Sequence, residues 1–227
     1  FLLFSLRLYF VRNKLYNIII IYYLRNLQMK LAIISTSHRK NSESKRVADS
    51  LKKYIHDIDK TIECFILDMF ESEIPLWTTE KKQNARFWED SYNKISKELD
   101  TSDGFLMVVP EYGGMSAPNS KNFFLLFNNG ELFHKPGLIV SISSGNGGAY
   151  PISELRASSY KNSHIMWIPE NIIIRNVEQF SPGNHGKLIP SWIDDRIKYS
   201  CDLLIKYAEY VRPIQKFINR KDFANGM

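Results

Sequence analysis

The sequence of 227 residues has only two cysteines, Cys64 and Cys201, which lie far apart and outside any Cys-x-x-Cys spacing. They are too few for the disulfide framework of a small secreted domain or for a thiolate zinc site. The chain also lacks the Gly-x-x-x-x-Gly-Lys-Ser/Thr pattern of P-loop nucleoside triphosphatases. The small number of cysteines favours a reducing compartment, and we expect a cytoplasmic protein with no metal site.

Clustered basic charge is also missing from most of the chain. The formal net charge is +6, but residues 1–28 contribute Arg7, Arg12, Lys14 and Arg25 and no acidic residue, which leaves +2 on the remainder. No stripe of Lys and Arg interleaved with aromatic residues occurs in that remainder. We therefore expect no binding of nucleic acid.

The first 28 residues contain no glycine, no proline and no long apolar run. Their longest uncharged stretch, Leu15–Leu24, is shorter than the roughly 20 residues of a transmembrane helix. Arg25–Gln28 offers no small-residue cleavage site for a secretory signal. We expect Met29 to be the physiological start and residues 1–28 to be translated upstream sequence outside the fold. The alternative is an amphipathic helix on a membrane surface, so membrane association is expected only if these residues are retained.

From Met29 onward, apolar strand-like runs alternate with longer helical patterns. This order is typical of one α/β domain, here residues 29–227, with a parallel sheet covered on both faces. The expected strands are Lys30–Ser35, Thr61–Leu67, Gly104–Pro110, Gly137–Ser143 and His164–Trp167 with or without Ile172–Arg175. The expected helices are Ser44–Ile58, Asn84–Leu99, Ser120–Phe127, Ile152–Ser159 and Ser191–Ile218. Ligands of such sheets bind at the carboxyl ends of the strands, where the loops after the first, third and fourth strands should meet.

Hydroxyl groups crowd the turn between the first strand and the first helix, Ser35–Ser44. The free N–H groups and positive dipole end of a helix N-terminus, together with hydroxyls and Arg39, would make a cage for a phosphate. An ordinary helix N-cap in a polar turn would explain the same serines.

Two later turns are rich in glycine, and each follows an expected strand. In Pro110–Pro118, paired glycines would let the backbone approach a flat ligand. In Ser143–Tyr150, several N–H groups would suit a developing anion. A structural turn would explain the first segment, and a flexible connection the second.

Together, in this order, the three loops resemble the NAD(P)H-dependent FMN reductase family of flavodoxin-like proteins. The resemblance covers about Lys30 to Asn176. The residues that match the family's three patterns are Ser37, Arg39, Ser42 and Ser44; Pro110, Glu111, Tyr112, Gly114, Lys121 and Asn122; and Lys135, Pro136, Ser143, Gly145, Gly147 and Gly148. Three residues depart from the patterns: Thr36 stands where Gly is usual, Gly113 where Asn is usual and Met115 where Ser is usual.

The resemblance implies a three-layer sandwich with a five-stranded parallel sheet in the order 2-1-3-4-5. It implies that the FMN phosphate is held by Ser37, Arg39, Ser42 and Ser44. It also implies that the isoalloxazine is lined by Pro110, Glu111, Tyr112, Gly113 and Gly114, and by Ser144, Gly145, Gly147 and Gly148. The protein would then be a homodimer or homotetramer.

Under the same resemblance the flavin carries the redox chemistry, and no side chain is required as acid or base. Hydride from NADPH or NADH would reach flavin N5, and backbone N–H groups of Gly145–Gly148 would meet the negative charge that develops at N1 and the C2 carbonyl. The electrons would pass to a second small molecule such as free flavin, a quinone, an azo compound or a metal oxyanion. The alternative is a flavodoxin-like electron carrier without pyridine-nucleotide activity, which would show a strongly acidic surface.

Several residues near these loops are expected to have structural roles. Glu111, beside the glycine turn, is expected to orient backbone groups and not to act as a base. His38 is expected to be exposed, and His185 to lie in a surface turn. His164, among apolar neighbours on the last strand, is expected to be a hydrogen-bonded core histidine.

Overall fold

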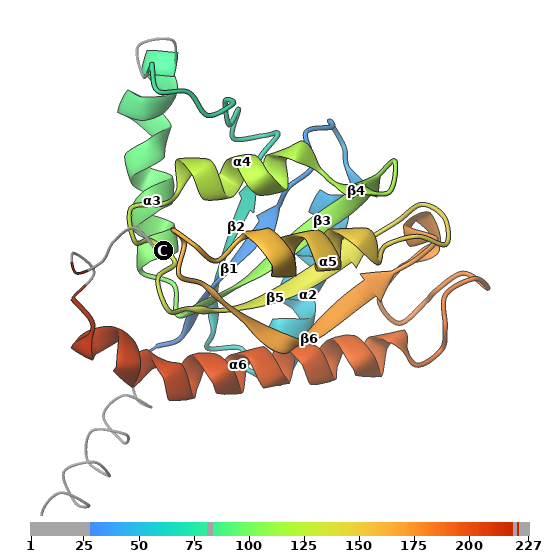
Figure 1. Cartoon of the computed structure of the whole chain (residues 1–227). Coiled ribbons are helices and arrows are strands. Elements are labelled where there is room, and N and C mark those ends of the chain that lie inside the picture. Colours follow the sequence, from blue (N-terminus) through green and yellow to red (C-terminus); the bar gives the residue numbers. More distant parts are fainter. Residues whose placement is uncertain (1–27, 81–83, 220–221, 223–227) are drawn as a thin grey trace, which may run out of the picture.

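A twisted sheet of parallel strands forms the centre of the structure, a computed structural model in which residues 28–80, 84–219 and 222 are described (Figure 1). The five parallel strands are β1 Lys30–Ser35, β2 Glu63–Asp68, β3 Gly104–Tyr112, β5 Pro136–Ile142 and β6 Met166–Ile174. They are ordered β2-β1-β3-β5-β6. The parallel sheet is therefore confirmed. The chain places β2 on one side of β1 and then β3, β5 and β6 on the other side, so the order of the strands reverses direction between β1 and β3.

A sixth short strand corrects the expected five-stranded sheet. β4, Met115–Ser116, pairs antiparallel with the end of β3, with Glu111 opposite Ser116. The pairing forms because the glycines between the two strands, Gly113 and Gly114, have φ values of +59° and +77°, which allow a tight reversal of the chain. The second loop is thus the turn of a short β-hairpin.

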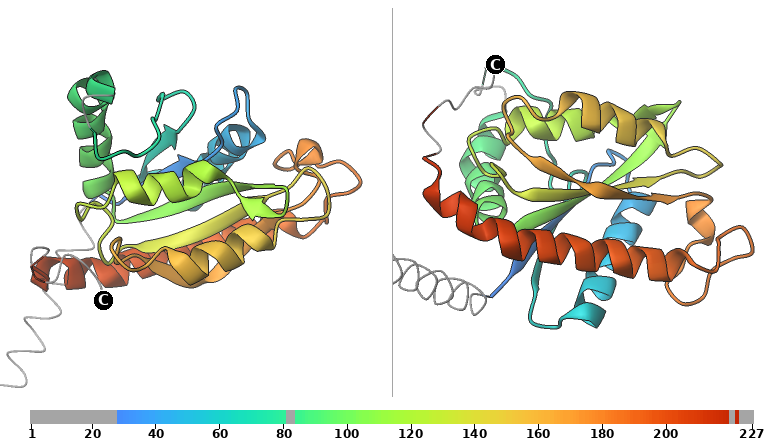
Figure 2. Two further views of the ribbon diagram at one scale, coloured as in Figure 1. Left: turned by 45° about the horizontal axis from the view of Figure 1, so that its top comes forward. Right: turned by 60° about the horizontal axis from the view of Figure 1, so that its bottom comes forward.

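Helices cover both faces of the sheet (Figures 1 and 2). The helices are α2 Glu43–Ile58, the π-helical segment η2 Phe87–Tyr92, α3 Asn93–Asp100, α4 Pro118–Leu126, α5 Tyr150–Ser158, the 3₁₀ turn η3 Val177–Gln179 and α6 Ile193–Phe217. α2 and α6 pack on one face, while η2, α3, α4 and α5 pack on the other. In β1, Leu31 and Ile33 point toward α2 and α6, and Ala32 and Ile34 point toward the helices on the other face. Successive side chains of a strand point to opposite faces of a sheet, so this alternation is expected.

Two expected elements differ in the structure. The expected helix Asn84–Leu99 is a π-helical segment that continues into α3, so its first part does not have the 3.6-residue period. The two runs expected for the last strand are one continuous strand, β6, which accommodates Pro169 where its register against β5 shifts.

Two histidines also differ from expectation. His164 precedes β6 in a turn with φ of +47°, and its buried Nε2 has no hydrogen-bond partner among the described residues. His185 lies in the expected surface loop, but its side chain is only 10% exposed and its ring stacks on Phe180. Its Nδ1 accepts the N–H of Ser181, and its Nε2 lies 3.0 Å from Asp194 Oδ1.

The expected N-terminal extension, residues 1–28, lies outside the described residues apart from Gln28. Within the part of the chain that the structure describes, none of the helices combines the length and the hydropathy needed to cross a membrane.

Candidate functional site

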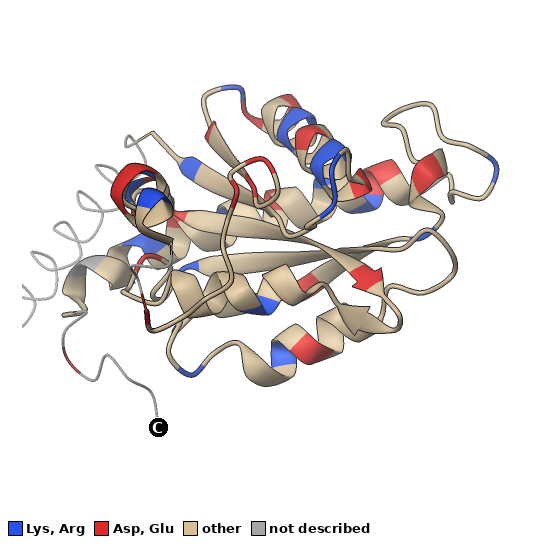
Figure 3. Ribbon diagram, turned by 90° about the horizontal axis from the view of Figure 1, so that it is seen from above, with Lys and Arg blue, Asp and Glu red and all other residues tan. Residues whose placement is uncertain are grey.

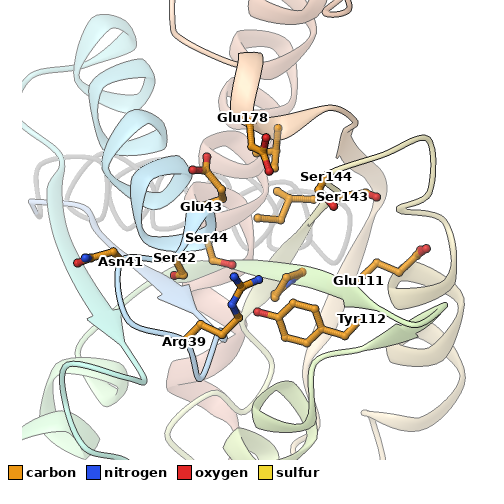
Figure 4. Close-up of a pocket in the computed structure, with 13 residues that line it drawn as sticks. Arg39, Asn41, Ser42, Glu43, Ser44, Glu111, Tyr112, Ser143, Ser144 and Glu178 are labelled. Carbon is orange, nitrogen blue, oxygen red and sulfur yellow. The ribbon is translucent and has the colours of Figure 1, made fainter.

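A cavity of about 280 Å³ opens at the carboxyl ends of β1, β3 and β5 (Figure 4). Seven of the predicted site residues line it: Arg39, Ser42, Ser44, Pro110, Glu111, Tyr112 and Ser144. The other lining residues are Asn41, Glu43, Ile142, Ser143, Val177 and Glu178. The structure therefore brings parts of all three predicted loops to one cavity, and adds a fourth wall from η3.

The N-terminus of α2 forms the floor of one end of this cavity. Ser42 is the N-cap, since its backbone is extended and its Oγ accepts the N–H of Lys45 at 3.2 Å. Ser44 lies in the first turn, and its Oγ is buried, lines the cavity and has no hydrogen-bond partner within residues 28–80, 84–219 and 222. A buried hydroxyl without a partner is costly unless a ligand completes it.

Arg39 is the cation of this end of the cavity. Figure 4 shows its side chain reaching from the first loop toward Ser44. None of the described carboxylates forms an ion pair with its guanidinium. An uncommitted guanidinium, an orphaned hydroxyl and a helix N-terminus together fit a terminal phosphate, because each supplies a donor to an anion.

Glu43 places a carboxylate at the same helix end, where it would oppose a phosphate. Arg46 neutralises it, since Arg46 Nε donates to Glu43 Oε2 at 2.7 Å. The two Nη groups of Arg46 also donate to the carbonyl oxygens of Val177 and Phe180. Arg46 thus ties the N-terminus of α2 to the η3 wall, which carries the exposed Glu178 facing the cavity (Figure 4).

Ser37 does not line the cavity, although it was predicted to hold phosphate. Its side chain is fully buried behind the loop, where Oγ lies 2.9 Å from the Tyr112 hydroxyl and accepts the N–H of Arg39 at 3.1 Å. Ser37 therefore fastens the first loop to the end of β3. The exposed His38 packs its ring edge against Tyr112 from the outside.

Glu111 fastens the second loop to the third. Its Oε2 accepts the N–H of Gly148 at 2.7 Å and of Tyr150 at 3.3 Å, at the N-terminus of α5. This confirms that Glu111 orients backbone groups. It also means that the N–H of Gly148 is already engaged by Glu111, so this residue does not offer one of the donors expected from the Gly145–Gly148 loop.

The predicted glycines lie around the cavity and not along its wall. Gly113 and Gly114 form the hairpin turn, and Gly145 lies in open space. A Cβ on Gly147 would lie 2.2 Å from Glu111 Oε1, and a Cβ on Gly148, where φ is +107°, would lie 2.6 Å from Ile173 Cγ2. Glycine at 147 and 148 therefore lets the third loop lie flat against Glu111 and β6.

Three further motif residues hold the scaffold. Asn122 accepts the N–H of Trp77 at 2.7 Å and donates to the Pro75 carbonyl at 2.8 Å, which anchors the loop after β2. Lys121 forms an ion pair with Glu154. The buried Lys135 donates to the carbonyl oxygens of Leu99 and Asp100 at the end of α3.

The structure adds residues that the motifs did not reveal. Val177 and Glu178 complete the cavity wall, and Arg46 holds this wall through the Val177 carbonyl oxygen. The i, i+3 spacing of Glu43 and Arg46 was a sequence signal for Arg46 alone, and this spacing is also common on exposed helices.

The family model of the NADPH-dependent FMN reductases matches residues 29–179. The chain belongs to this family. A search of the curated proteins found no match. As a member of the family, the chain is an oxidoreductase with FMN as its cofactor and NAD(P)H as its co-substrate. The orphaned Ser44 hydroxyl and the free Arg39 guanidinium fit the phosphate of that cofactor.

Solved structures with the same fold share little sequence with this FMN reductase family member. An oxidoreductase from Corynebacterium diphtheriae is 16% identical with a TM-score of 0.64, over 80% of this chain and 97% of that one. FerB, a flavoenzyme NAD(P)H:(acceptor) oxidoreductase from Paracoccus denitrificans, is 17% identical with a TM-score of 0.62, over 81% and 98%. The apo form of an NADH:FMN oxidoreductase, EMOB, is 12% identical with a TM-score of 0.58, over 78% and 88%.

Proposed function

We propose that this flavin-dependent oxidoreductase takes electrons from NADPH or NADH and delivers them to a second small molecule. The acceptor classes are free flavin, a quinone, an azo compound or a metal oxyanion. The observation that carries the proposal is the convergence of Arg39 and the unpartnered Ser44 hydroxyl at the N-terminus of α2, inside a cavity bordered by all three loops.

Each part of the cavity has a separate role in this proposal. Arg39 and Ser44 bind the phosphate, while Ser42 caps α2 and keeps its first N–H groups in place. Arg46 screens the charge of Glu43, which would otherwise repel the phosphate. Ser37 supports Arg39 from behind through its contacts with the Arg39 N–H and Tyr112.

The second and third loops orient the flat part of the ligand. Pro110, Glu111 and Tyr112 form one wall, and Ser144 belongs to the other. Glu111 joins the two walls through the N–H groups of Gly148 and Tyr150. When bound, FMN accepts hydride from the nicotinamide and passes electrons to the acceptor, and the protein contributes binding, orientation and electrostatics.

The proposed acceptor step is supported by the fold likeness to FerB, a flavoenzyme NAD(P)H:(acceptor) oxidoreductase. We propose a cytoplasmic location on the basis of the cysteine content, with the FMN-binding domain spanning residues 29–227. Most side chains that line the cavity are polar, and Pro110, Ile142 and Val177 add apolar surface.

Anaerobic reduction separates this enzyme from an electron carrier of the same fold. NADPH and NADH are added in turn to the FMN-loaded chain while the visible flavin absorbance is followed. The proposal expects rapid bleaching with one of the two nucleotides, and recovery of the absorbance when an acceptor from the four classes is added. A chain that holds FMN but keeps its absorbance with both nucleotides would be a carrier, and the proposal would fail.

A further inference from the structure

Two large apolar side chains stand at the tip of the β3–β4 hairpin, beside the cavity. Met115, in β4, is 58% exposed, and Tyr150, the first residue of α5, is 63% exposed. α5 packs against β4, and Figure 1 shows β4 and the start of α5 at the same end of the sheet. Exposed apolar side chains that gather beside a concave site are typical of a ligand-binding surface. We call this pair of residues the shelf.

The glycine turn of the hairpin lies between the two side chains. A Cβ on Gly113 would lie 3.8 Å from Met115 Cε, and a Cβ on Gly114 would lie 3.9 Å from Tyr150 Cδ2. Apart from the chain neighbours, no other heavy atom of the described residues lies within 4 Å of either position. The shelf therefore flanks a turn whose backbone is otherwise open.

Backbone contacts fix the shelf to the rim of the cavity. Met115 pairs with Tyr112 in the hairpin, and the N–H of Tyr150 donates to Glu111 Oε2 at 3.3 Å. Tyr112 and Glu111 both line the cavity. A flat ligand that projects from the cavity past the hairpin would therefore meet the shelf. Because these contacts use main-chain groups of Met115 and Tyr150, their side chains can be changed without removing them.

The shelf is more apolar than the family pattern predicts. Gly113 stands where Asn is usual and Met115 where Ser is usual, so two polar side chains are replaced by a hydrogen atom and a thioether. The cation next to the hairpin, Lys121, forms an ion pair with Glu154, which also accepts the hydroxyl of Ser116. An oxyanion on the shelf would therefore find this cation already committed.

We propose that the shelf packs against the ring of an uncharged planar acceptor, a quinone with two fused rings, and selects it over a metal oxyanion. The inference rests on the proposed function, in which the second and third loops hold the flat part of FMN beside this hairpin. A thioether and a phenol ring both make favourable contacts with an aromatic ring. They offer no charge that would offset the desolvation of an anion.

The reaction balances with the co-substrate of the family. NADPH or NADH gives up two electrons and one proton as hydride, a second proton comes from the solvent, and the quinone takes up both electrons and both protons to become the hydroquinone. Met115 and Tyr150 neither donate nor accept a proton or an electron in this balance. Their effect is on acceptor binding, so it appears in KM more than in kcat.

Quinone binding to the oxidised, FMN-loaded full chain tests the shelf without electron transfer. The probe is a dimethylnaphthoquinone with both methyl groups on the quinone ring, which leaves that ring no free position for attack by a cysteine thiol. Equilibrium dialysis gives its dissociation constant. Met115→Ser restores the usual family residue and should raise the constant about threefold, as should Tyr150→Ser, and the double variant should raise it about tenfold. Tyr150→Phe keeps the ring and should stay within about twofold of the parent.

Tyr160→Ser is the matched control, because Tyr160 is 39% exposed just beyond the other end of α5. It should leave the dissociation constant of the quinone unchanged. All variants should keep the FMN content and the melting temperature of the parent chain. In turnover, the double variant should raise KM for the quinone about tenfold, whereas kcat/KM for chromate should change by less than about twofold.

The inference is wrong if the double variant binds the quinone as the parent does, if Tyr160→Ser weakens binding equally, or if turnover of chromate and of the quinone falls to the same extent. An unchanged constant for the quinone together with a raised KM for NADPH or NADH would assign the shelf to the nicotinamide instead. Failure of the proposed function is seen separately, as a flavin that neither nucleotide bleaches, because the binding measurement uses no nucleotide.

Discussion

Arg39 and Lys40 are adjacent, exposed cations of the first loop, but only Arg39 lines the cavity. A hydrogen bond to a charged group contributes about 1.5–3 kcal/mol. Arg39→Gln should therefore raise the FMN dissociation constant by about ten- to a hundredfold, as measured by quenching of flavin fluorescence. Lys40→Gln removes the same charge from the same loop and should leave the constant within about twofold. Equal effects of the two substitutions would mean that only the overall charge matters.

Gly147 and Gly145 make a second pair of matched positions. A Cβ at 147 would collide with Glu111 Oε1, whereas a Cβ at 145 would meet no atom within 4 Å. Gly147→Ala should displace Glu111 from the N–H groups of Gly148 and Tyr150, lowering the unfolding free energy by about 1–3 kcal/mol. Gly145→Ala should change it by less than about 0.5 kcal/mol. Denaturant unfolding of both variants, followed by FMN titration, checks this. Similar losses in the two would show that the contact with Glu111 is unimportant.

At the scale of single residues, the sequence predicted those whose role depends on their own loop. Arg39, Ser42 and Ser44 could be recognised because a helix N-terminus is a local feature. The position of Ser37 could not, since its partner Tyr112 comes from another strand. The engagement of the Gly148 N–H by Glu111 likewise depends on a contact between two distant loops.

Arg46 connects two elements, α2 and the η3 turn. Arg46→Gln should leave the Glu43 carboxylate unpaired at the phosphate end of the cavity and release the carbonyl oxygens of Val177 and Phe180. We expect FMN to bind at least tenfold more weakly and the amides of residues 177–180 to exchange hydrogen faster. Lys45→Gln is the control, because among the described carboxylates Lys45 forms its ion pair with Asp49, one turn further along α2. Unchanged exchange in Arg46→Gln would show that η3 is held by other contacts.

Glu154 joins α5 to the β4 hairpin and to α4. The hydrogen bond from Ser116 Oγ, at 2.6 Å, is the main reason that its pKa is lowered from the ordinary value of 4.5, and the ion pair with Lys121 adds to it. A lowered pKa in the folded state stabilises the protein above the unfolded-state pKa, and this stabilisation is lost as the pH falls through the folded-state pKa.

Glu154→Gln should therefore lower the melting temperature at neutral pH, and its difference from the parent should disappear as the pH falls well below 4.5. Thermal melts over this range measure the effect. Glu89→Gln serves as control, because Glu89 is exposed and has no ion pair with a described residue. A difference that persisted in acid would indicate a packing defect and not a loss of charge.

Elements with a clear period were predicted best. β1, β3 and β5 are buried apolar runs, and α2 has a regular amphipathic pattern. The π-helical start before α3 breaks the period, and Pro169 divides the apolar pattern of β6, so both elements were misread. β4 has two residues and no pattern of its own, because it exists only through pairing with β3.

At the scale of the whole molecule, parallel strand order explains why three loops separated by many residues form one cavity. The carboxyl ends of β1, β3 and β5 lie side by side in the sheet, and the chain reverses direction next to them. Acidic and basic residues are interspersed on the helices around this edge (Figure 3). The alternation of strands and helices predicted this geometry, whereas the η3 wall, beyond the last motif, required the structure.

A comparison of FMN with riboflavin tests most directly whether the N-terminus of α2 holds a phosphate, because the two ligands differ only in that group. Each is titrated into the flavin-free full chain while its fluorescence is followed. FMN should bind at least a hundredfold more tightly than riboflavin, and Arg39→Gln should narrow this difference in affinity while Lys40→Gln preserves it. Equal affinities for the two flavins in the parent chain would contradict it.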